Sequence, residues 1–271
     1  MAKDLTRAIT HEHYGKAESG LQKYYHKVEK IIYHTPRQFT KESIEKGGVF
    51  NFASDEFMTQ PDTSNGLPFI VGGSSLSSLL ALFFLLKEEL GTPGTVYVCI
   101  AVTALIFSII YYFTKPPKES ILNRRDGLVT MEGALYQPNI TMRFKNVIFC
   151  FSTGGENGLG AYKLEAIRPN NYTFAMFHAS GKDCYYDMSF YVWYMDKNRP
   201  LPPGSAFDTF RQRDFERRKE EGFPRPLYMS NVPTPEATPE QQKERERFWK
   251  EEFLEKDGVL MRHFTSSGVD K

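Results

Sequence analysis

Charged residues are absent from two long stretches of this sequence. The chain has 271 residues and 25% of them are charged, but Phe69–Leu86 and Thr95–Thr114 contain no Asp, Glu, Lys, Arg or His. A helix needs roughly 17–25 mostly apolar residues to cross about 30 Å of hydrocarbon. The two stretches therefore predict two transmembrane helices, in preference to a hairpin of buried helices in a soluble core.

The same lack of ionisable groups limits what the two helices do. Ion pathways and proton relays usually place titratable side chains inside the membrane, where such groups are costly and therefore functional. We expect no transport function from these helices alone. The alternative is a pore assembled from many copies of the chain.

Cysteine and histidine are also scarce. The sequence has three cysteines: Cys99 in the second apolar stretch, and Cys150 and Cys184 in the rest of the chain. A disulfide framework is not expected in a reducing compartment. His11 and His13 lie two residues apart without a further Cys or His nearby, so we expect no metal site and no cofactor.

The segment between the apolar stretches is LKEELGTPGT, residues 86–95. Gly91, Pro93 and Gly94 predict a tight turn there. Positively charged residues flank the outer ends of the pair, whereas the turn contains only Lys87 beside two glutamates. The positive-inside rule then places both termini in the cytoplasm. We predict a transmembrane hairpin over residues 68–115 in a multi-pass protein whose other residues are almost all cytoplasmic.

Small residues recur every four positions in both stretches. Gly73 and Ser77 have this spacing in the first stretch, and Ala104 and Ser108 have it in the second. Small residues at positions i and i+4 let helix backbones approach closely. We expect these four residues to pack the two helices on each other. The alternative is a surface for oligomers or for a membrane partner.

Residues 1–67 form a polar segment with one periodic part. Between residues 17 and 34, apolar side chains recur with the spacing of one helix face, from Leu21 to Ile32. This pattern predicts an amphipathic helix. The helix would dock on the cytoplasmic domain, or lie on the inner membrane surface with its lysines facing anionic lipid.

Residues 116–203 have the composition of a β domain. SILNRRDGLVTM, residues 120–131, predicts two strands joined by a turn at Asp126-Gly127. One long strand is predicted over 140–152, and further strands over 161–168 and 172–178. A helix over 184–198 should cover the sheet. The expected fold class is an α+β membrane protein whose antiparallel β-meander forms a half-barrel of pleckstrin-homology type, closed by that helix.

Residues 204–271 are rich in charge and contain a proline-rich link. A first helix is predicted with Asp208 as its N-cap. After the link, a second helix is predicted with Thr238 as N-cap in a capping-box sequence, and Gly258 as its stop.

Four cations follow the second apolar stretch: Lys115, Lys118, Arg124 and Arg125. We predict that they contact lipid headgroups, at about 1 kcal/mol each near an anionic surface. They would otherwise serve only as a topology signal. Basic and acidic residues are interleaved elsewhere and the net charge is +1, so we expect no nucleic-acid partner.

Two further patterns suggest chemistry and are set aside. Ser152–Gly160 is glycine-rich, but a strand is predicted after it, whereas a phosphate-binding loop needs a helix there. His178, Asp183 and Cys184 include a nucleophile and a base. Asp183 is, however, more simply a helix cap and Cys184 a small residue at the helix start. We expect no enzyme and no catalytic residue.

Three stretches carry a resemblance to a group of bacterial proteins. They are ILNRRDGLVTM directly after the hairpin, DMSFYVWYMDKNRPLPPGSAFD (187–208) and PTPEATPEQQKERERFW (233–249). In these stretches the chain resembles inner-membrane proteins associated with type VI secretion and polymorphic-toxin loci. The resemblance implies a bacterial inner-membrane location and a membrane-anchored immunity or accessory protein. It implies no active-site residue.

These features favour a non-enzymatic protein that is held in a membrane and binds a protein partner, such as a toxin or a secretion component. The alternative is a membrane scaffold or sensor that recognises lipid headgroups through the β domain. An enzyme that acts on a membrane substrate is the third hypothesis.

Overall fold

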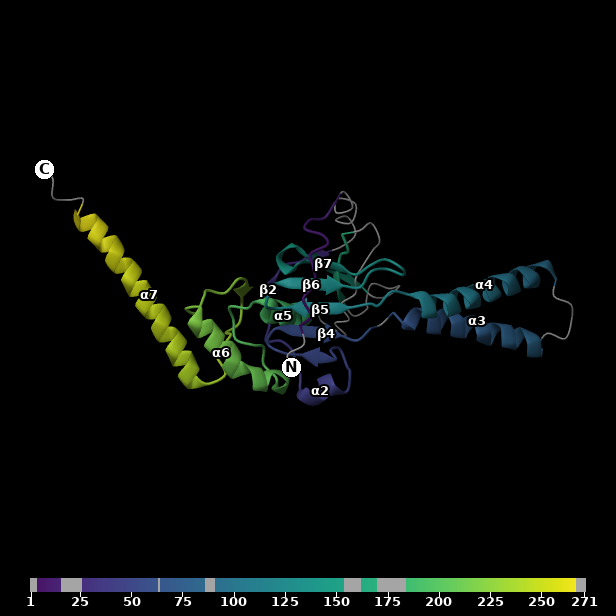
Figure 1. Cartoon of the computed structure of the whole chain (residues 1–271), viewed down its shortest axis with the longest axis horizontal. Helices are drawn as coiled ribbons and strands as arrows, with labels where there is room; N and C mark the ends of the chain where they lie inside the picture. The colour runs from purple at the N-terminus through teal and green to yellow at the C-terminus, as the bar shows by residue number, and fades with distance from the viewer. Residues whose placement is uncertain are drawn as a thin grey trace.

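A computed structural model of the chain describes residues 4–15, 26–62, 64–85, 91–153, 162–169 and 184–266. Figure 1 shows a region of β-strands in the middle, with helices α3 and α4 projecting from one end and helix α7 from the other. The described chain is a mixed α+β structure with antiparallel sheets and two long apolar helices.

The two apolar helices are α3 (Gly66–Leu85) and α4 (Thr92–Thr114). Both are long and apolar enough to cross a membrane, and only 17% of the most apolar window of each is buried. Their bounds lie close to those of the charge-free stretches. Pro93 lies in the first turn of α4, where its missing N–H costs no hydrogen bond.

The central sheet has five strands in the order β3–β4–β5–β6–β7, and every neighbouring pair is antiparallel. Its strands are β3 (Phe52–Ala53), β4 (Phe57–Gln60), β5 (Ser120–Asn123), β6 (Leu128–Met131) and β7 (Ile140–Arg143). The predicted hairpin is confirmed, since Asn123 pairs with Leu128 across the turn. Gly127 has φ +67° in that turn, a conformation that glycine adopts at little cost.

The helical hairpin is an insertion in this sheet. β4 leads into α3, α4 leads into β5, and Gln60 pairs with Ser120 where the helices leave the sheet. Strands from both sides of the insertion share one sheet, so residues 1–67 and 116–203 are not separate units. The sequence did not reveal this because β3 and β4 have only two and four residues, too few for a period of two to be recognised.

The remaining strands form a three-stranded sheet, β1–β8–β9, and a parallel pair, β2–β10. They are β1 (His26–Val28), β2 (Ile31–Ile32), β8 (Phe149–Thr153), β9 (Tyr162–Ala166) and β10 (Met229–Ser230). The helix predicted over 17–34 is wrong from residue 26 onward, where β1 and β2 form; residues 16–25 lie outside the described part. Val28 and Ile32 are buried, and this tertiary burial outweighs the helical spacing.

The single strand predicted over 140–152 is two strands in two different sheets. β7 ends at Arg143, a 3-10 turn spans Phe144–Asn146, and β8 begins at Phe149. The rings of Phe144 and Phe149 are both buried, with centroids 5.6 Å apart. The turn therefore carries the chain between sheets while both aromatic rings stay in the core. The strand predicted over 172–178 lies outside the described residues.

Helix α5 (Cys184–Met195) is the predicted covering helix. It packs against β2 and β9, and most of its side chains are buried. The hydroxyl of Ser189 accepts hydrogen bonds from the backbone N–H groups of Tyr33 and His34, just after β2, and donates to the carbonyl of Tyr185. The buried run from Met188 to Met195 places this helix in the core, where it joins the two smaller sheets.

A short helix, α2 (Lys41–Glu45), is capped by Thr40 and packs on the 3-10 turn at Ser205–Phe210. Gly204 precedes that turn with φ +126°, and a Cβ there would lie 2.4 Å from the carbonyl oxygen of Phe39. Only glycine fits this close approach.

Two charged helices follow, α6 (Arg211–Glu220) and α7 (Pro239–Ser266). The prediction that Asp208 caps the first of these helices is wrong. Asp208 lies inside the 3-10 turn and accepts a hydrogen bond from Arg211. Thr238 is confirmed as a cap, since its Oγ1 accepts from the N–H of Gln241. The predicted stop at Gly258 is wrong. Glycine inside a helix costs only about 1 kcal/mol, and α7 continues through it.

Candidate functional site

Most of the large exposed apolar side chains belong to α3 and α4. Phe69 is 66% exposed, Phe83 79% and Phe113 78%. Contiguous apolar surface of this extent marks a site of contact with an apolar partner or a membrane. The outer surface of the hairpin is therefore the largest candidate site among the described residues.

Four hydroxyl groups of the hairpin, those of Ser74, Thr103, Ser108 and Thr114, donate to carbonyls of their own helices. Thr103 Oγ1 donates to the carbonyl of Cys99 at 2.8 Å, and Ser108 Oγ donates to the carbonyl of Ala104 at 2.8 Å. An α-helix also satisfies its own backbone groups. These donors therefore need no water, which suits a non-aqueous environment.

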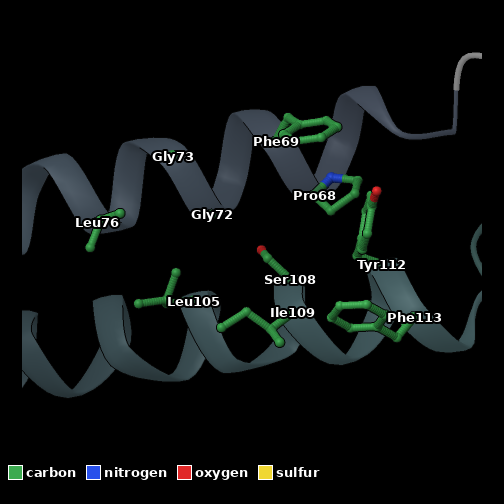
Figure 2. A pocket seen from close by; sticks show the side chains of 10 residues that line it. All are labelled: Pro68, Phe69, Gly72, Gly73, Leu76, Leu105, Ser108, Ile109, Tyr112 and Phe113. Carbon is green, nitrogen blue, oxygen red and sulfur yellow. The ribbon is translucent and has the colours of Figure 1, made fainter.

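Ser108 is the residue through which α4 meets α3. It is 3% exposed, and a Cβ built on Gly72 would lie 3.1 Å from the Cβ of Ser108. Figure 2 shows Gly72 on the side of α3 that faces Ser108. Small residues thus pack the two helices closely, with Ser108 of α4 opposite Gly72 of α3.

The other predicted packing residues lie off this contact. Gly73 has nothing within 4 Å of the position of a Cβ, and Ser77 is exposed. Ala104 is only partly buried, whereas Ala101 is 6% exposed. One step along a helix turns the side chain by about 100°. The spacing therefore identified the right type of residue without fixing which face it occupies.

A groove of about 390 Å³ runs between the two helices at the end nearest the sheet. Figure 2 shows Leu76 of α3 and Leu105 of α4 on facing sides of the groove, and Phe69 and Phe113 also line it. Its lining is almost wholly apolar. The groove suits an acyl chain or an apolar side chain, and it lacks the convergent polar groups that orient a polar ligand.

The segments that join the helices to the sheet are clamped together by Lys115. Its Nζ lies 3.3 Å from a carboxylate oxygen of Asp62 and donates to Ser64 Oγ. Only 12% of its side chain is exposed. Burial raises the pKa of the Asp62 carboxyl, but hydrogen bonds from Ser64 and the charge of Lys115 lower that pKa by more. Lys115 therefore serves an internal contact rather than the predicted headgroup contact.

Lys118 is held inside the protein at the same end of the sheet. It is 7% exposed, and its Nζ donates to the carbonyl of Gln137 at 2.6 Å. Burial lowers the pKa of Lys118, and the nearby charge of Arg168 lowers it further. Its position near the hairpin agrees with the prediction, but its charge faces a carbonyl group of the protein.

Arg124 contradicts the predicted headgroup contact. It is 2% exposed and follows β5, whose four residues carry the chain about 13 Å away from the hairpin. Its Nη1 lies 2.5 Å from a carboxylate oxygen of Asp214, and its Nη2 donates to the carbonyls of Asp196 and Arg199. A guanidinium with these partners cannot reach a lipid surface.

Asp214 of α6 is the centre of a buried ion network. Arg218 donates to Asp214 at 2.9 Å and binds Glu236 through both Nη atoms. Arg245 of α7 adds a second cation to Glu236 at 2.8 Å. Burial raises the pKa of the Asp214 carboxyl, but Arg124 and Arg218 lower that pKa by more. The network ties β5, α6 and α7 together, so its role is structural.

Arg125 keeps 41% of its side chain exposed, but it also lies at the far end of β5. Its guanidinium lies 5.1 Å from the ring centroid of Phe57, and its Nη1 lies 3.7 Å from a carboxylate oxygen of Glu56. The predicted cationic group is thus divided between two ends of the sheet.

A small charged hollow of about 170 Å³ lies near Arg124. The cations Arg143, Lys145 and Lys197 line it, together with Tyr228. Burial, helped by the charge of Asp196, raises the pKa of Tyr228 to about 12, so its hydroxyl keeps a proton. The three cations are exposed, and solvent and salt weaken the attraction of such groups for an anion.

The residues considered for chemistry do not form a site in the described part of the chain. No group of three or more His, Cys, Asp or Glu side chains that could hold a metal occurs among the described residues, which include His11 and His13. Cys184 is buried at the start of α5. His178, Asp183 and the glycine-rich residues from 154 to 160 lie outside the described residues.

Sequence reasoning identified cations and missed their partners. Asp62 lies just before the first apolar stretch and Lys115 just after the second. Because a hairpin brings its two outer ends together, this placement could have predicted that they form a pair. Asp214 lies 90 residues from Arg124 along the chain, and nothing local indicates that contact.

No protein-family model, curated protein or solved structure matches this chain. Among the described residues, the exposed apolar surface of the hairpin is the main feature on which a functional proposal can rest.

Proposed function

We propose that α3 and α4 cross a lipid bilayer and anchor the β domain to it. The observation that carries this proposal is exposure, because only 17% of the most apolar window of each helix is buried. Removing one large apolar side chain from water is worth roughly 1.5–3 kcal/mol, so the exposed set as a whole is worth on the order of tens of kcal/mol. The internally bonded hydroxyls support the same environment.

The insertion point supports the orientation of the hairpin. Because β4 and β5 are paired neighbours, the strands before α3 and after α4 lie on the same side of the bilayer. The positive-inside rule assigns that side to the cytoplasm. The resemblance assigns the bilayer to a bacterial inner membrane.

Cysteine accessibility tests insertion and orientation together. In a Cys99→Ser background, Thr92→Cys places a thiol at the start of α4, and Glu220→Cys places one at the end of α6. A membrane-impermeant maleimide should label Thr92→Cys in intact spheroplasts, and Glu220→Cys only after lysis. Labelling of both in intact spheroplasts would overturn the orientation, and release of the chain by alkaline carbonate would overturn insertion.

We further propose that the end of the domain far from the hairpin binds a protein partner. Leu227 is 55% exposed, and Met229, two residues later at the start of β10, is 74% exposed. Phe253 on α7 is 61% exposed, and α7 projects away from the domain in Figure 1. Exposed apolar groups of this kind favour an interaction surface.

The resemblance favours a toxin or a secretion component as the partner, with this chain as a non-enzymatic immunity or accessory protein. Co-expression should then restore growth in the presence of the toxin-like product of a neighbouring gene. Replacing both Leu227 and Met229 with Ser should abolish the rescue without changing the amount of protein in the membrane. Lys41→Ser, which replaces a side chain that is 74% exposed on α2, is the control and should keep the rescue.

Rescue that survives the double replacement would exclude this surface. Absence of rescue, in cells whose secretion still requires the gene, would favour the accessory role over immunity.

The alternative of a lipid-headgroup sensor has lost most of its basis. Arg124 is buried, and Lys115 and Lys118 are bonded to protein atoms. The half-barrel of pleckstrin-homology type remains a proposal, supported by the packing of α5 on β2 and β9.

A further inference from the structure

The loop between β6 and β7 lies at the foot of the hairpin. β6 ends at Met131 and β7 begins at Ile140. β5 starts just after α4, and β6 is antiparallel to β5. The chain leaving β6 therefore returns to the end of the sheet from which the helices project. We call residues 132–139 the foot loop.

The foot loop is fixed by contacts with the segment that follows α4. Lys118 Nζ donates to the carbonyl of Gln137 at 2.6 Å, and Asn139 Nδ2 donates to the carbonyl of Pro117 at 3.2 Å. A Cβ on Gly133 would lie 2.1 Å from the carbonyl oxygen of Pro138, so the loop closes tightly on itself. These contacts give the loop one defined shape.

Tyr136 joins the foot loop directly to α4. Its ring meets the ring of Tyr111 edge to face, with centroids 5.3 Å apart, and its hydroxyl shares a 2.8 Å hydrogen bond with Thr114 Oγ1 in the last turn of α4. Despite these contacts, Tyr136 is 46% exposed. A half-exposed ring with a satisfied hydroxyl suits the boundary between apolar and aqueous layers.

Leu135 is exposed in a strained conformation. Its φ is +46°, in the left-handed region, and 48% of the residue is exposed. A left-handed backbone is a genuine outlier for a bulky residue, and such strain persists where the surrounding structure enforces it, most often at functional sites. Here the strain holds an apolar side chain outward beside the apolar base of the hairpin.

We propose that the foot loop is a second membrane contact, with Leu135 in the edge of the hydrocarbon layer and Tyr136 at headgroup level. The inference rests on the proposed insertion of the hairpin. Continuity supports a lipid occupant, because Tyr112 (43% exposed) and Phe113 (78% exposed) lie at the same end of α4. Aromatic rings gather at this level of a bilayer. Two helices and one loop then fix the depth and tilt of the domain.

Depth-dependent quenching tests the contact in the full chain reconstituted in phospholipid vesicles. An environment-sensitive dye is attached to Leu135→Cys in a Cys99→Ser background, and separately to Glu220→Cys in the same background and to the native Cys99. Nitroxide lipids labelled just below the headgroup should quench the dye at residue 135 several-fold more than the dye at residue 220. Nitroxides deep in the acyl chain should quench the dye on Cys99.

The outcomes separate this inference from the proposed function. Quenching at Cys99, with residue 135 behaving like residue 220, would overturn the foot-loop contact and leave the hairpin inserted. Absence of quenching at both Cys99 and residue 135 would overturn the foot-loop contact and the insertion of the hairpin. A blue-shifted dye at residue 135 that lipid nitroxides do not quench would mean that protein covers the loop, and would also overturn the contact.

A second variant distinguishes a lost contact from a damaged fold. Leu135→Gly removes the apolar side chain and relieves the backbone strain, because glycine accepts positive φ. In detergent we expect its melting temperature to equal or exceed that of the wild type. In vesicles we expect the extra stabilisation that lipid gives the wild type to shrink. An equal gain in both settings would count against a lipid contact at Leu135.

Discussion

The two ends of β5 carry the same kind of side chain in opposite surroundings. At the hairpin end, Lys115 pairs with Asp62, whose side chain is 37% exposed. At the far end, Arg124 pairs with Asp214, and the two side chains are 2% and 1% exposed. Coulomb attraction grows as the local dielectric falls, so the ion pair at the far end should matter far more to folding.

This comparison also explains why a count of cations misled the sequence interpretation. Lys115, Lys118, Arg124 and Arg125 lie within eleven residues of one another, which favours a shared role near the membrane. A strand separates them into two environments, and the environment decides whether a cation meets lipid, water or a buried carboxylate.

The largest expected effect is loss of the ion network at the far end. Asp214→Asn leaves Arg124 and Arg218 without their shared carboxylate in the protein interior. Breaking a buried pair by removing one partner costs about 3–5 kcal/mol. We expect a loss of this size in the free energy of unfolding of the full chain in detergent, measured by urea titration with tryptophan fluorescence.

Asp208→Asn is the matched control for that experiment. Asp208 also pairs with an arginine three residues later, Arg211, but its side chain is 62% exposed, and exposed pairs contribute about 0–1 kcal/mol. Equal losses for the two variants would mean that burial does not separate the two pairs.

The predicted and unpredicted parts of the structure divide along the same line between local and distant causes. The apolar helices, the Asp126-Gly127 turn and the cap at Thr238 follow from residues within a few positions of each other. The pairing of β4 with β5 across the inserted hairpin, and of Arg124 with Asp214, depends on contacts between distant parts of the chain. Periodicity has no access to such contacts, so the mixed α+β class was predictable and the sharing of one sheet was not.

The candidate site divides in the same way. The apolar surface of the hairpin follows directly from its composition, but the face of each helix used for packing does not. Gly72 and Gly73 are adjacent glycines in the same apolar stretch, and only the position of α4 shows which of them lies in the contact between the helices. The foot loop had no signal in the sequence, because its relation to α4 arises from strand pairing.

Alkaline pH should strengthen the far end of the sheet through Lys30. Its Nζ donates to the carbonyl of Val147 at 2.6 Å, and burial, with a smaller contribution from Lys27, lowers the pKa of Lys30 from 10.5 to about 8. Between these values the unfolded chain binds more protons than the folded chain, so stability rises with pH; below the lower value the cost of the buried charge is fully present.

We expect the wild type to gain on the order of 2 kcal/mol relative to Lys30→Met between about pH 7 and pH 10. Urea titrations at both ends of this range measure the difference. Lys41→Met removes a lysine whose side chain is 74% exposed and should leave the pH profile of the wild type unchanged. Parallel profiles for wild type and Lys30→Met would contradict the assignment.

Within the hairpin, adjacent glycines should differ. Gly72→Leu forces a large side chain against Ser108, where even a Cβ would lie 3.1 Å from the Cβ of Ser108. Overpacking of this kind costs typically about 1–3 kcal/mol. Gly73→Leu points into open space and should be near neutral. The melting temperature in detergent should fall for the first variant only.

A larger fall in melting temperature for Gly73→Leu than for Gly72→Leu, accompanied by loss of cross-linked oligomers, would assign the outer face of α3 to contact with a second copy rather than to lipid.

The smallest expected effect belongs to the clamp at the hairpin base. Lys115→Met should cost more than the shared contact is worth, because it also loses the bond to Ser64 Oγ. Asp62→Asn keeps the Oδ1 acceptor of both hydrogen bonds from Ser64 and should cost less. The double-mutant cycle isolates the pair itself, and a partly exposed pair should give a coupling of about 1 kcal/mol or less. The corresponding cycle of Asp214→Asn with Arg124→Met should give a coupling several-fold larger.

A coupling at the clamp as large as that at the network would mean that lipid and protein together exclude water at the hairpin base. The two ends of β5 would then differ in partner but not in polarity.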